Sequence, residues 1–474
     1  MKRSFPYFGL MLLLGLASLL LYLVAWSLQD LRHHTIEFLL TFFATFILYA
    51  AATVLVLKQG VPHTRGIMIT IFGFAFVFNA LLVSTPPTLS DDMYRYIWDG
   101  RVQAQGISPY RYPPDAVELV NLRDKQVWRF INRKSVVTVY PPVAEMVYAL
   151  LWRIVPDSIR WFQVFMACMG LLAGGLLVGL LKEMGRSPVR VVIFLWSPLL
   201  IYEVAHSAHI DALILPLLIG AWWARLRERD GLTGLLLGLA SAVKLFPIFL
   251  LPALWRPNHP QGRWRMPLAF LLIVLACYLP YLVTTGGDVV GFLPTYLTER
   301  FNVAPPLVWL LETIPHQQFA DSQRVIQFSA LGFLALVGLL MVLRPARDGE
   351  SALRRCLWPI SIFTLLNPNL FSWYLLWLLP LLAIFLESGQ LRWRGKPYPF
   401  GLRLDVWTAW WVFCGLVMLS YTFFLDWETL PTAINIQFWP LYTLLGIALL
   451  RQVWQRYFQH GNALPPGGGV IILS

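Results

Sequence analysis

The sequence has few charged residues and few cysteines. Only 13% of its 474 residues are charged, whereas soluble domains carry about 25%. The four cysteines lie within or beside apolar runs and lack metal-ligand spacing, so we expect them to be small hydrophobic core residues. The sequence contains no glycine-rich phosphate motif, internal repeat or low-complexity tract. These absences argue against a soluble enzyme and against a nucleotide-binding domain.

Long apolar runs dominate instead. Hydrophobic residues make up 58% of the chain, and the mean hydropathy is +0.62. A run of about 20 apolar residues crosses the hydrocarbon core of a bilayer. On that rule, spans are predicted near residues 7–28, 35–57, 66–84, 161–182, 189–205, 209–226, 265–285, 324–343, 352–368, 370–387, 404–425 and 436–456. We therefore predict an all-α polytopic membrane protein with about 12–14 transmembrane helices.

Two apolar segments do not fit the rule for a simple span. Residues 143–155 are too short and carry Glu145 and Arg153, so they are predicted to form an amphipathic helix in the membrane interface. Residues 232–255 are interrupted by Lys244 and Pro247, which favours a hairpin of two short helices. If residues 232–255 formed a single span, every later loop would lie on the opposite side of the membrane, and the Lys and Arg asymmetry between the two sides would be reversed.

The charge distribution predicts the orientation. The net charge of +12 fits basic loops on the cytoplasmic side better than a nucleic-acid partner. With the N-terminus inside, most Lys and Arg residues fall in the inner segments. The long loops 85–160 and 286–323 and the hairpin tip at Lys244 then face outward. The chain is predicted to be one integral membrane domain, composed of two N-terminal spans (1–65), a central module (66–390), C-terminal spans (391–458) and a flexible tail (459–474).

The first long outer loop opens with the most unusual stretch of the chain, Ser90 to Arg101. Asp91 and Asp92 are adjacent carboxylates, and either could deprotonate a sugar hydroxyl as a general base. Arg95 and Arg101 could hold phosphate oxygens, and a helix would place Asp92, Arg95 and Asp99 on roughly one face. The alternative is helix capping and surface ion pairing. The position against the bilayer and the three aromatic residues of the stretch favour the functional interpretation.

Other polar positions converge on the same predicted face. Tyr110 and Tyr140 lie in proline-rich segments that are expected to be rigid walls on which a sugar could stack, although interfacial aromatics in turns explain them equally well. His206, His209 and Asp211 link two spans and could bind a phosphate, polarise the base or hold a divalent cation, although their spacing matches no closed metal site. Hydrogen-bonded helix ends are the alternative. Lys244 could meet a lipid phosphate, with snorkelling to the interface as the alternative.

Together these motifs resemble the GT-C superfamily of membrane glycosyltransferases. The stretch from Asp91 to Arg101, the Tyr140-Pro141-Pro142 segment and the His209-to-Leu213 segment are most similar to bacterial polyprenol-phosphate-mannose-dependent mannosyltransferases. The resemblance covers roughly residues 66–390. One departure is that two spans, rather than the usual one, precede the span that leads into the acidic loop.

The resemblance implies an inverting transferase on the extracytoplasmic face of a bacterial inner membrane. A polyprenyl-phosphate sugar, expected to be mannose, would be the donor, and a glycan or lipid would be the acceptor. Asp92, with Asp91 second, would be the base, and Arg95, Arg101 and Lys244 would stabilise the leaving phosphate. No cofactor is required by this mechanism, and a divalent cation remains open.

Two other functions were weighed. A transporter or flippase of a lipid-linked sugar is the main alternative. Transporters often show repeated halves and charges near the bilayer midplane. This sequence has no internal repeat, and its unusual polar residues converge on one predicted face. A non-catalytic assembly subunit would give no reason for paired carboxylates facing basic residues.

Overall fold

The computed structural model describes residues 5–58, 63–293, 299–313, 319–393 and 396–458. The predicted tail 459–474 and parts of the loop 286–323 lie outside these residues. The described chain is almost entirely helical, which confirms the predicted all-α polytopic class. It contains seven helices that are long and apolar enough to cross a membrane, or eight if one bent pair is counted as a single span. Where 12–14 spans were predicted, most of the remaining apolar runs are built from shorter helices.

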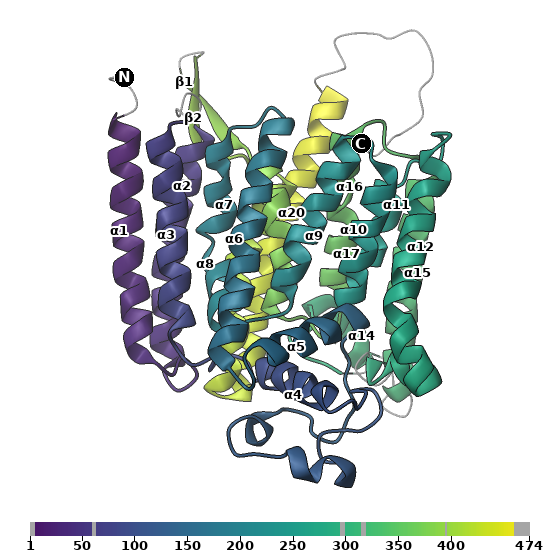
Figure 1. Cartoon of the computed structure of the whole chain (residues 1–474). Helices are drawn as coiled ribbons and strands as arrows, with labels where there is room; N and C mark the ends of the chain where they lie inside the picture. The colour runs from purple at the N-terminus through teal and green to yellow at the C-terminus, as the bar shows by residue number, and fades with distance from the viewer. Residues whose placement is uncertain (1–4, 59–62, 294–298, 314–318, 394–395, 459–474) are drawn as a thin grey trace.

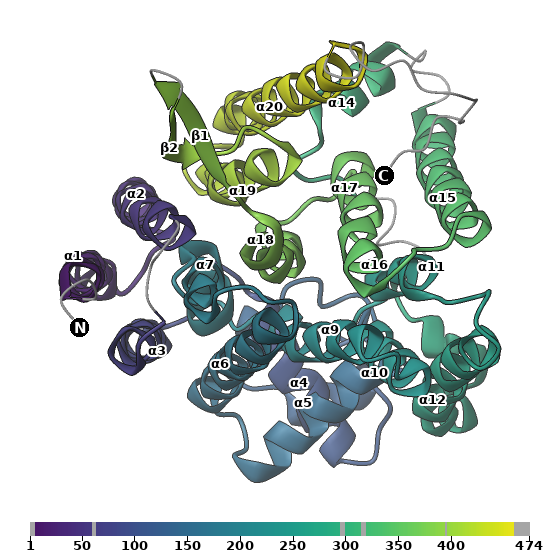
Figure 2. The same ribbon diagram turned by 90° about the horizontal axis from the view of Figure 1, so that it is seen from above.

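The long helices stand side by side in one bundle (Figure 1). They are α1 (Phe5–Leu28), α2 (Thr35–Leu57), α3 (Arg65–Val83), α6 (Ile159–Glu183), α12 (Gly262–Thr285), α19 (Val406–Leu416) continued by η9 (Val417–Phe424), and α20 (Leu430–Phe458). Seen from above, α1, α2 and α3 gather at one side of the bundle, and α15 (Phe319–Leu343) stands near α12 at the other (Figure 2).

Several predicted spans are broken by prolines. The run 189–205 becomes η3 (Pro188–Val191) and α7 (Val192–Leu195), followed across a 54° bend by α8 (Pro198–Leu200) and η4 (Ile201–His206). Pro198 lacks an N–H and disfavours helical backbone at Ser197, which explains the bend. The later runs give the short helices α16 (Gly349–Arg355), α17 (Leu357–Leu366), η8 (Ser372–Leu378) and α18 (Leu379–Phe385).

The predicted hairpin is confirmed. The helix α9 (Asp211–Leu226) is followed by α10 (Asp230–Val243), a break at Lys244, and then η5 (Phe246–Leu250) and α11 (Leu251–Leu254). The start of α10 and the end of α11, which we call the feet of the hairpin, lie close together. Arg256 lies 3.5 Å from Asp230, and Arg225 at the end of α9 donates to the Leu254 carbonyl over 2.8 Å. Lys244 is therefore at the tip, at the opposite end from these feet.

Two amphipathic helices cross one end of the bundle, the lower end in Figure 1, which we call the site end. They are α4 (Asp92–Ala104) and α5 (Pro142–Ile154), and α5 confirms the helix predicted at 143–155. Between them the chain folds beneath the bundle with η1 (Val117–Leu122) and η2 (Trp128–Phe130). Gly100 allows α4 to approach α5 closely, since a Cβ there would lie 2.5 Å from the Tyr148 carbonyl oxygen.

The opposite end carries a small antiparallel hairpin that the sequence did not predict, formed by β1 (Ser388–Trp393) and β2 (Lys396–Leu402) (Figure 1). Near the site end lie η6 (Gly286–Val290), α14 (Pro305–Thr313) and η10 (Trp427–Thr429).

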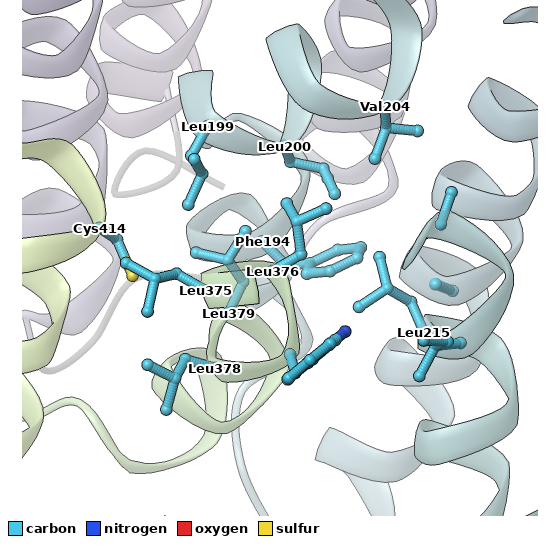
Figure 3. Packing of buried hydrophobic residues seen from close by; sticks show 14 of the residues in the cluster. Phe194, Leu199, Leu200, Val204, Leu215, Leu375, Leu376, Leu378, Leu379 and Cys414 are labelled. Atoms are coloured by element: carbon cyan, nitrogen blue, oxygen red, sulfur yellow. The ribbon is translucent and has the colours of Figure 1, made fainter. Parts of the chain in front are cut away.

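The broken helices pack around a continuous apolar core. Leucines of η8 and α18 meet Phe194 of α7, Leu199 and Leu200 of α8, and Cys414 of α19 (Figure 3). Three cysteines, including Cys414, are buried as expected, but Cys168 is exposed on α6. This core fixes the short segments whose ends carry the polar residues of the site end.

Candidate active site

A cavity of about 1350 Å³ opens at the site end and brings distant segments together. Its polar wall includes Asp91, Asp92 and Arg95 from the start of α4, together with Lys244 from the hairpin tip. Its apolar wall comes from η5, α15 and α17, with Phe246, Phe249, Leu331, Leu334, Phe363 and Leu366. A site that joins charged groups to a hydrophobic wall suits an amphiphilic ligand.

The basic groups outnumber the acidic ones around this cavity. Its described lining contains the cationic side chains Arg32, Arg95, Arg133, Lys244 and Arg300. The carboxylates in the same lining are Asp91, Asp92 and Glu299. The excess of positive charge favours an anionic ligand over a neutral sugar alone.

The two adjacent aspartates have different partners. The Asp91 carboxylate accepts a hydrogen bond of 2.7 Å from Arg32, which lies in the turn between α1 and α2 and also donates to the Thr88 carbonyl. The Asp92 carboxylate accepts a hydrogen bond of 3.0 Å from Asn132, and its other oxygen lies 3.7 Å from His209 Nδ1. Asp91 therefore ties the N-terminal helices to the site, whereas Asp92 contacts an amide and an imidazole at the cavity wall.

Arg95 lies one helical turn after Asp92 and is braced from behind. Its Nε donates to both oxygens of Asp99, at 2.9 and 3.0 Å, and its Nη1 donates to the Val136 carbonyl. Its Nη2 has no hydrogen-bond partner among the described residues, and the side chain is only 7% exposed. A braced guanidinium with a spare donor at a cavity wall is suited to an anion.

Asp99 and Glu145 form the support behind Arg95. Glu145 accepts a hydrogen bond of 2.6 Å from Thr138 and another from Gln103. Burial raises the pKa of Asp99, although Arg95 opposes the shift. Burial, with the charge of Asp99, raises the pKa of Glu145 well above its usual range. Glu145 therefore keeps a proton to a higher pH than a carboxyl in water.

Lys244 and Asp211 form an ion pair that the sequence did not predict. Lys244 Nζ donates to both oxygens of Asp211, at 2.8 and 3.0 Å, and lies 4.3 Å from the centre of the Tyr374 ring. Asp211 is buried at the start of α9, while Lys244 remains 21% exposed and lines the cavity. The ammonium is thus fixed by a buried carboxylate and presented to the cavity.

Six predicted site residues are not part of the described cavity lining, namely Asp99, Arg101, Tyr110, His206, His209 and Asp211. Three of them, Arg101, Tyr110 and His206, have structural partners. The Arg101 guanidinium contacts Asp124 and Asp157 and ties α4 to the loop beneath it. Tyr110 donates to the Tyr140 carbonyl over 2.6 Å, and of these two tyrosines only Tyr140 lines the cavity. The His206 ring contacts Thr85 and Thr88 at 3.0 and 3.1 Å, which anchors the segment that leads into α4.

The residues considered for a divalent cation are separated by these contacts. His206 faces Thr85 and Thr88, His209 faces Asp92, and Asp211 faces Lys244. Among the described residues, no group of three or more His, Cys, Asp or Glu side chains could hold a metal ion.

Sequence reasoning missed Arg32, Asn132, Glu203 and Trp373. The sequence contains a feature that could have identified two of them, Arg32 and Glu203. Arg32 is a basic residue in a short loop predicted to be outside, against the positive-inside tendency. Glu203 is a carboxylate within a predicted span, where a charge is costly and marks a functional position.

A helical membrane bundle with carboxylates and basic side chains around a partly apolar cavity has the architecture of a membrane glycosyltransferase. The family model described as "alpha-(1→6)-mannopyranosyltransferase, N-terminal domain" matches residues 13–256. The chain therefore belongs to this mannosyltransferase family, and the resemblance to GT-C mannosyltransferases is confirmed. The chain is also 23% identical over 298 residues to GPI mannosyltransferase 1 of Gibberella zeae, covering 54% of this chain and 68% of that protein.

Proposed function

We propose that this mannosyltransferase moves mannose from a polyprenyl-phosphate donor to a glycan or lipid acceptor, with inversion at the anomeric carbon, on the extracytoplasmic face of a bacterial inner membrane. The observation that carries the proposal is that Asp92, Lys244 and the apolar wall from η5, α15 and α17 line one cavity. A lipid-phosphate sugar has a reactive carbon, an anion and a hydrocarbon chain, and each matches one part of this lining.

The donor is placed by charge and hydrophobicity. The polyprenyl chain lies against the phenylalanines and leucines of η5, α15 and α17, which provide an apolar surface that matches its hydrocarbon. The phosphate lies between Lys244 and Arg95, whose positive charges favour the phosphate monoester dianion that leaves.

The chemistry assigns one task to each group. The acceptor hydroxyl oxygen attacks C1, the bond from C1 to the phosphate oxygen breaks with its electron pair, and Asp92 takes the hydroxyl proton. General-base catalysis of this kind contributes typically about 10²- to 10⁴-fold in rate. Because the leaving group is already a stable phosphate, this mechanism needs no activated metal centre.

A donor comparison tests the proposal. The full-length protein in proteoliposomes is given radiolabelled polyprenyl-phosphate mannose, polyprenyl-phosphate glucose or GDP-mannose, together with a panel of mannoside and lipid acceptors. We expect transfer from the polyprenyl-phosphate mannose only, and NMR of the product should show the anomeric configuration opposite to that of the donor. Transfer from GDP-mannose with no lipid present, or retention of configuration, would contradict the proposal.

A further inference from the structure

Two buried ionisable groups behind Asp92 have no task in the chemistry above. The Glu203 and His209 side chains are both fully buried, and His209 Nε2 lies 3.3 Å from a Glu203 oxygen. The other ring nitrogen, Nδ1, lies 3.7 Å from Asp92. The imidazole therefore stands between two carboxylates, one on the cavity wall and one in the core.

The backbone around His209 is shaped to produce this contact. The segment η4 is wound as a π-helix, a form that occurs mostly in short pieces and often at functional sites. After it, Ala208 adopts a left-handed conformation with φ of 54°, and the His209 N–H donates to the Glu203 carbonyl over 3.0 Å. A left-handed alanine costs energy that the surrounding structure must offset. The chain thus folds His209 back over Glu203.

The other partners of Glu203 are two hydroxyl groups. Ser372 donates to it over 2.6 Å, and Tyr421 donates to it over 3.1 Å. Both are neutral hydroxyl groups. A buried carboxylate is expensive unless a positive charge compensates it. Among the Glu203 contacts in the described chain, His209 is the group that can carry that charge.

The face of the imidazole is covered by an indole. The rings of His209 and Trp373 stack with centroids 3.7 Å apart and planes 19° from parallel. An aromatic face attracts a cation more strongly than a neutral ring. The stack also restricts the plane of the imidazole, whose two nitrogens lie within 4 Å of Glu203 and Asp92 but form no hydrogen bond among the described residues.

We propose that His209 is an imidazolium clamped by Glu203 and Trp373, and that it acts as a positioning residue which orients the Asp92 carboxylate and keeps it ionised as the base. This inference rests on the proposed function. His209 keeps its own proton throughout, and the acceptor proton goes to Asp92. The other titratable groups nearby are Tyr421 of η9, the Asp211–Lys244 pair, and His206 in the same turn.

The test is the pH dependence of kcat/KM for mannosyl transfer in the full-length protein. In the wild type, we expect activity to rise with pH as Asp92 ionises and to fall at higher pH as His209 loses its proton. In Glu203→Gln, the imidazole loses a neighbouring carboxylate, so the falling limb should move to lower pH. In His209→Gln, the falling limb should disappear and the rising limb should move to higher pH.

The matched control is His206→Gln, which removes a second buried histidine of the same turn that contacts Thr85 and Thr88 instead of Asp92. Its profile should keep both limbs at the wild-type pH. Thermal melts of every variant identify misfolded protein, and Trp373→Leu provides a second variant that should also move the falling limb to lower pH.

Several outcomes would overturn the inference. Glu203→Gln and Trp373→Leu could both lose activity equally at every pH, while the rising and falling limbs of their pH profiles stay at the wild-type pH. That result would mean that these residues only support the fold. A wild-type protein that transfers mannose without any falling limb would also refute it, while leaving the proposed function intact. A wild-type protein that transfers nothing from the lipid donor would refute the proposed function, and the inference with it.

Discussion

At the scale of the residue, Asp91 and Asp92 differ in role because of their partners. Asp91 is held by Arg32 over 2.7 Å, and Asp92 is held by Asn132 and faces His209. An arginine ion pair holds Asp91, whereas the partners of Asp92 are an amide and an imidazole. The contacts therefore support Asp92 as the base and Asp91 as a tie to the N-terminal helices.

The Lys244–Asp211 pair allows binding and stability to be separated. Lys244→Met should lower the melting temperature, because it leaves Asp211 buried without a cation, a change that costs about 3–5 kcal/mol. The double variant Lys244→Met/Asp211→Asn should recover most of that stability but not the transfer activity. Melts by tryptophan fluorescence and transfer assays on the same samples provide the comparison. Wild-type transfer by the double variant would exclude Lys244 as a phosphate ligand.

Glu145 should make stability depend on pH. Its folded pKa is raised, so its contribution is fully present below the unfolded value of 4.5 and is lost as pH rises through the folded value. Glu145→Gln carries no ionisable proton, so its melting temperature should fall less between pH 5 and 8 than that of the wild type. The exposed Glu118→Gln is the control and should follow the wild type. Equal slopes for all three proteins would refute a buried, protonated Glu145.

The sequence predicted the charged residues of the cavity better than their supports. Asp92, Arg95 and Lys244 stood out because charges beside apolar runs are rare. Arg101 had the same signal, yet it pairs with Asp124 and Asp157, since nothing local distinguishes a ligand-binding arginine from a bracing one. Contacts between segments far apart in the chain decide that difference.

At the scale of the element, the close packing of α4 on α5 positions Asp92. Gly100→Ala would place a methyl group 2.5 Å from the Tyr148 carbonyl oxygen and 2.9 Å from the Trp152 Cβ, so the two helices would have to separate. Overpacking of this kind typically costs about 1–3 kcal/mol. We expect a lower melting temperature and a marked loss of transfer.

The matched control for this change is Gly73→Ala on α3, where an added Cβ would meet no atom within 4 Å. It should retain the wild-type melting temperature and activity. If Gly100→Ala behaves like Gly73→Ala, the spacing of α4 and α5 does not control the site.

Hydropathy predicted the long helices well and the broken ones poorly. The long helices, such as α6 (Ile159–Glu183), begin and end within a few residues of the predicted positions, because an unbroken apolar run of this length forms a single helix. The run 189–205 instead bends at Pro198 and continues as a π-helix. Proline marks the break, but the π-helical segment η4 packs against α3 and α6, and no local sequence pattern contains those contacts.

At the scale of the whole molecule, the two ends of the bundle differ in chemistry. The site end carries α4, α5 and the cavity, and the opposite end carries the feet of the hairpin and ion pairs such as Arg227–Glu183 (Figure 1). We propose, from the positive-inside tendency, that the end opposite the site faces the cytoplasm. The proposed extracytoplasmic site follows from this assignment.

Cysteine labelling in intact spheroplasts tests the orientation. In a Cys168→Ser background, which removes the exposed native thiol, Lys125→Cys beneath α4 should react with a membrane-impermeant maleimide from outside. Arg229→Cys at the hairpin feet should react only after permeabilisation. The reverse pattern would place the site in the cytoplasm and exclude the proposed location.

The central claim is that Asp92 is the base for mannosyl transfer from a lipid phosphate. The most direct measurement is the transfer rate from saturating polyprenyl-phosphate mannose in proteoliposomes, for wild type, Asp92→Asn and the exposed-loop control Asp115→Asn. We predict that Asp92→Asn loses about 10²- to 10⁴-fold in kcat while its donor binding and melting temperature are retained, and that Asp115→Asn matches the wild type. Wild-type turnover by Asp92→Asn would contradict the account.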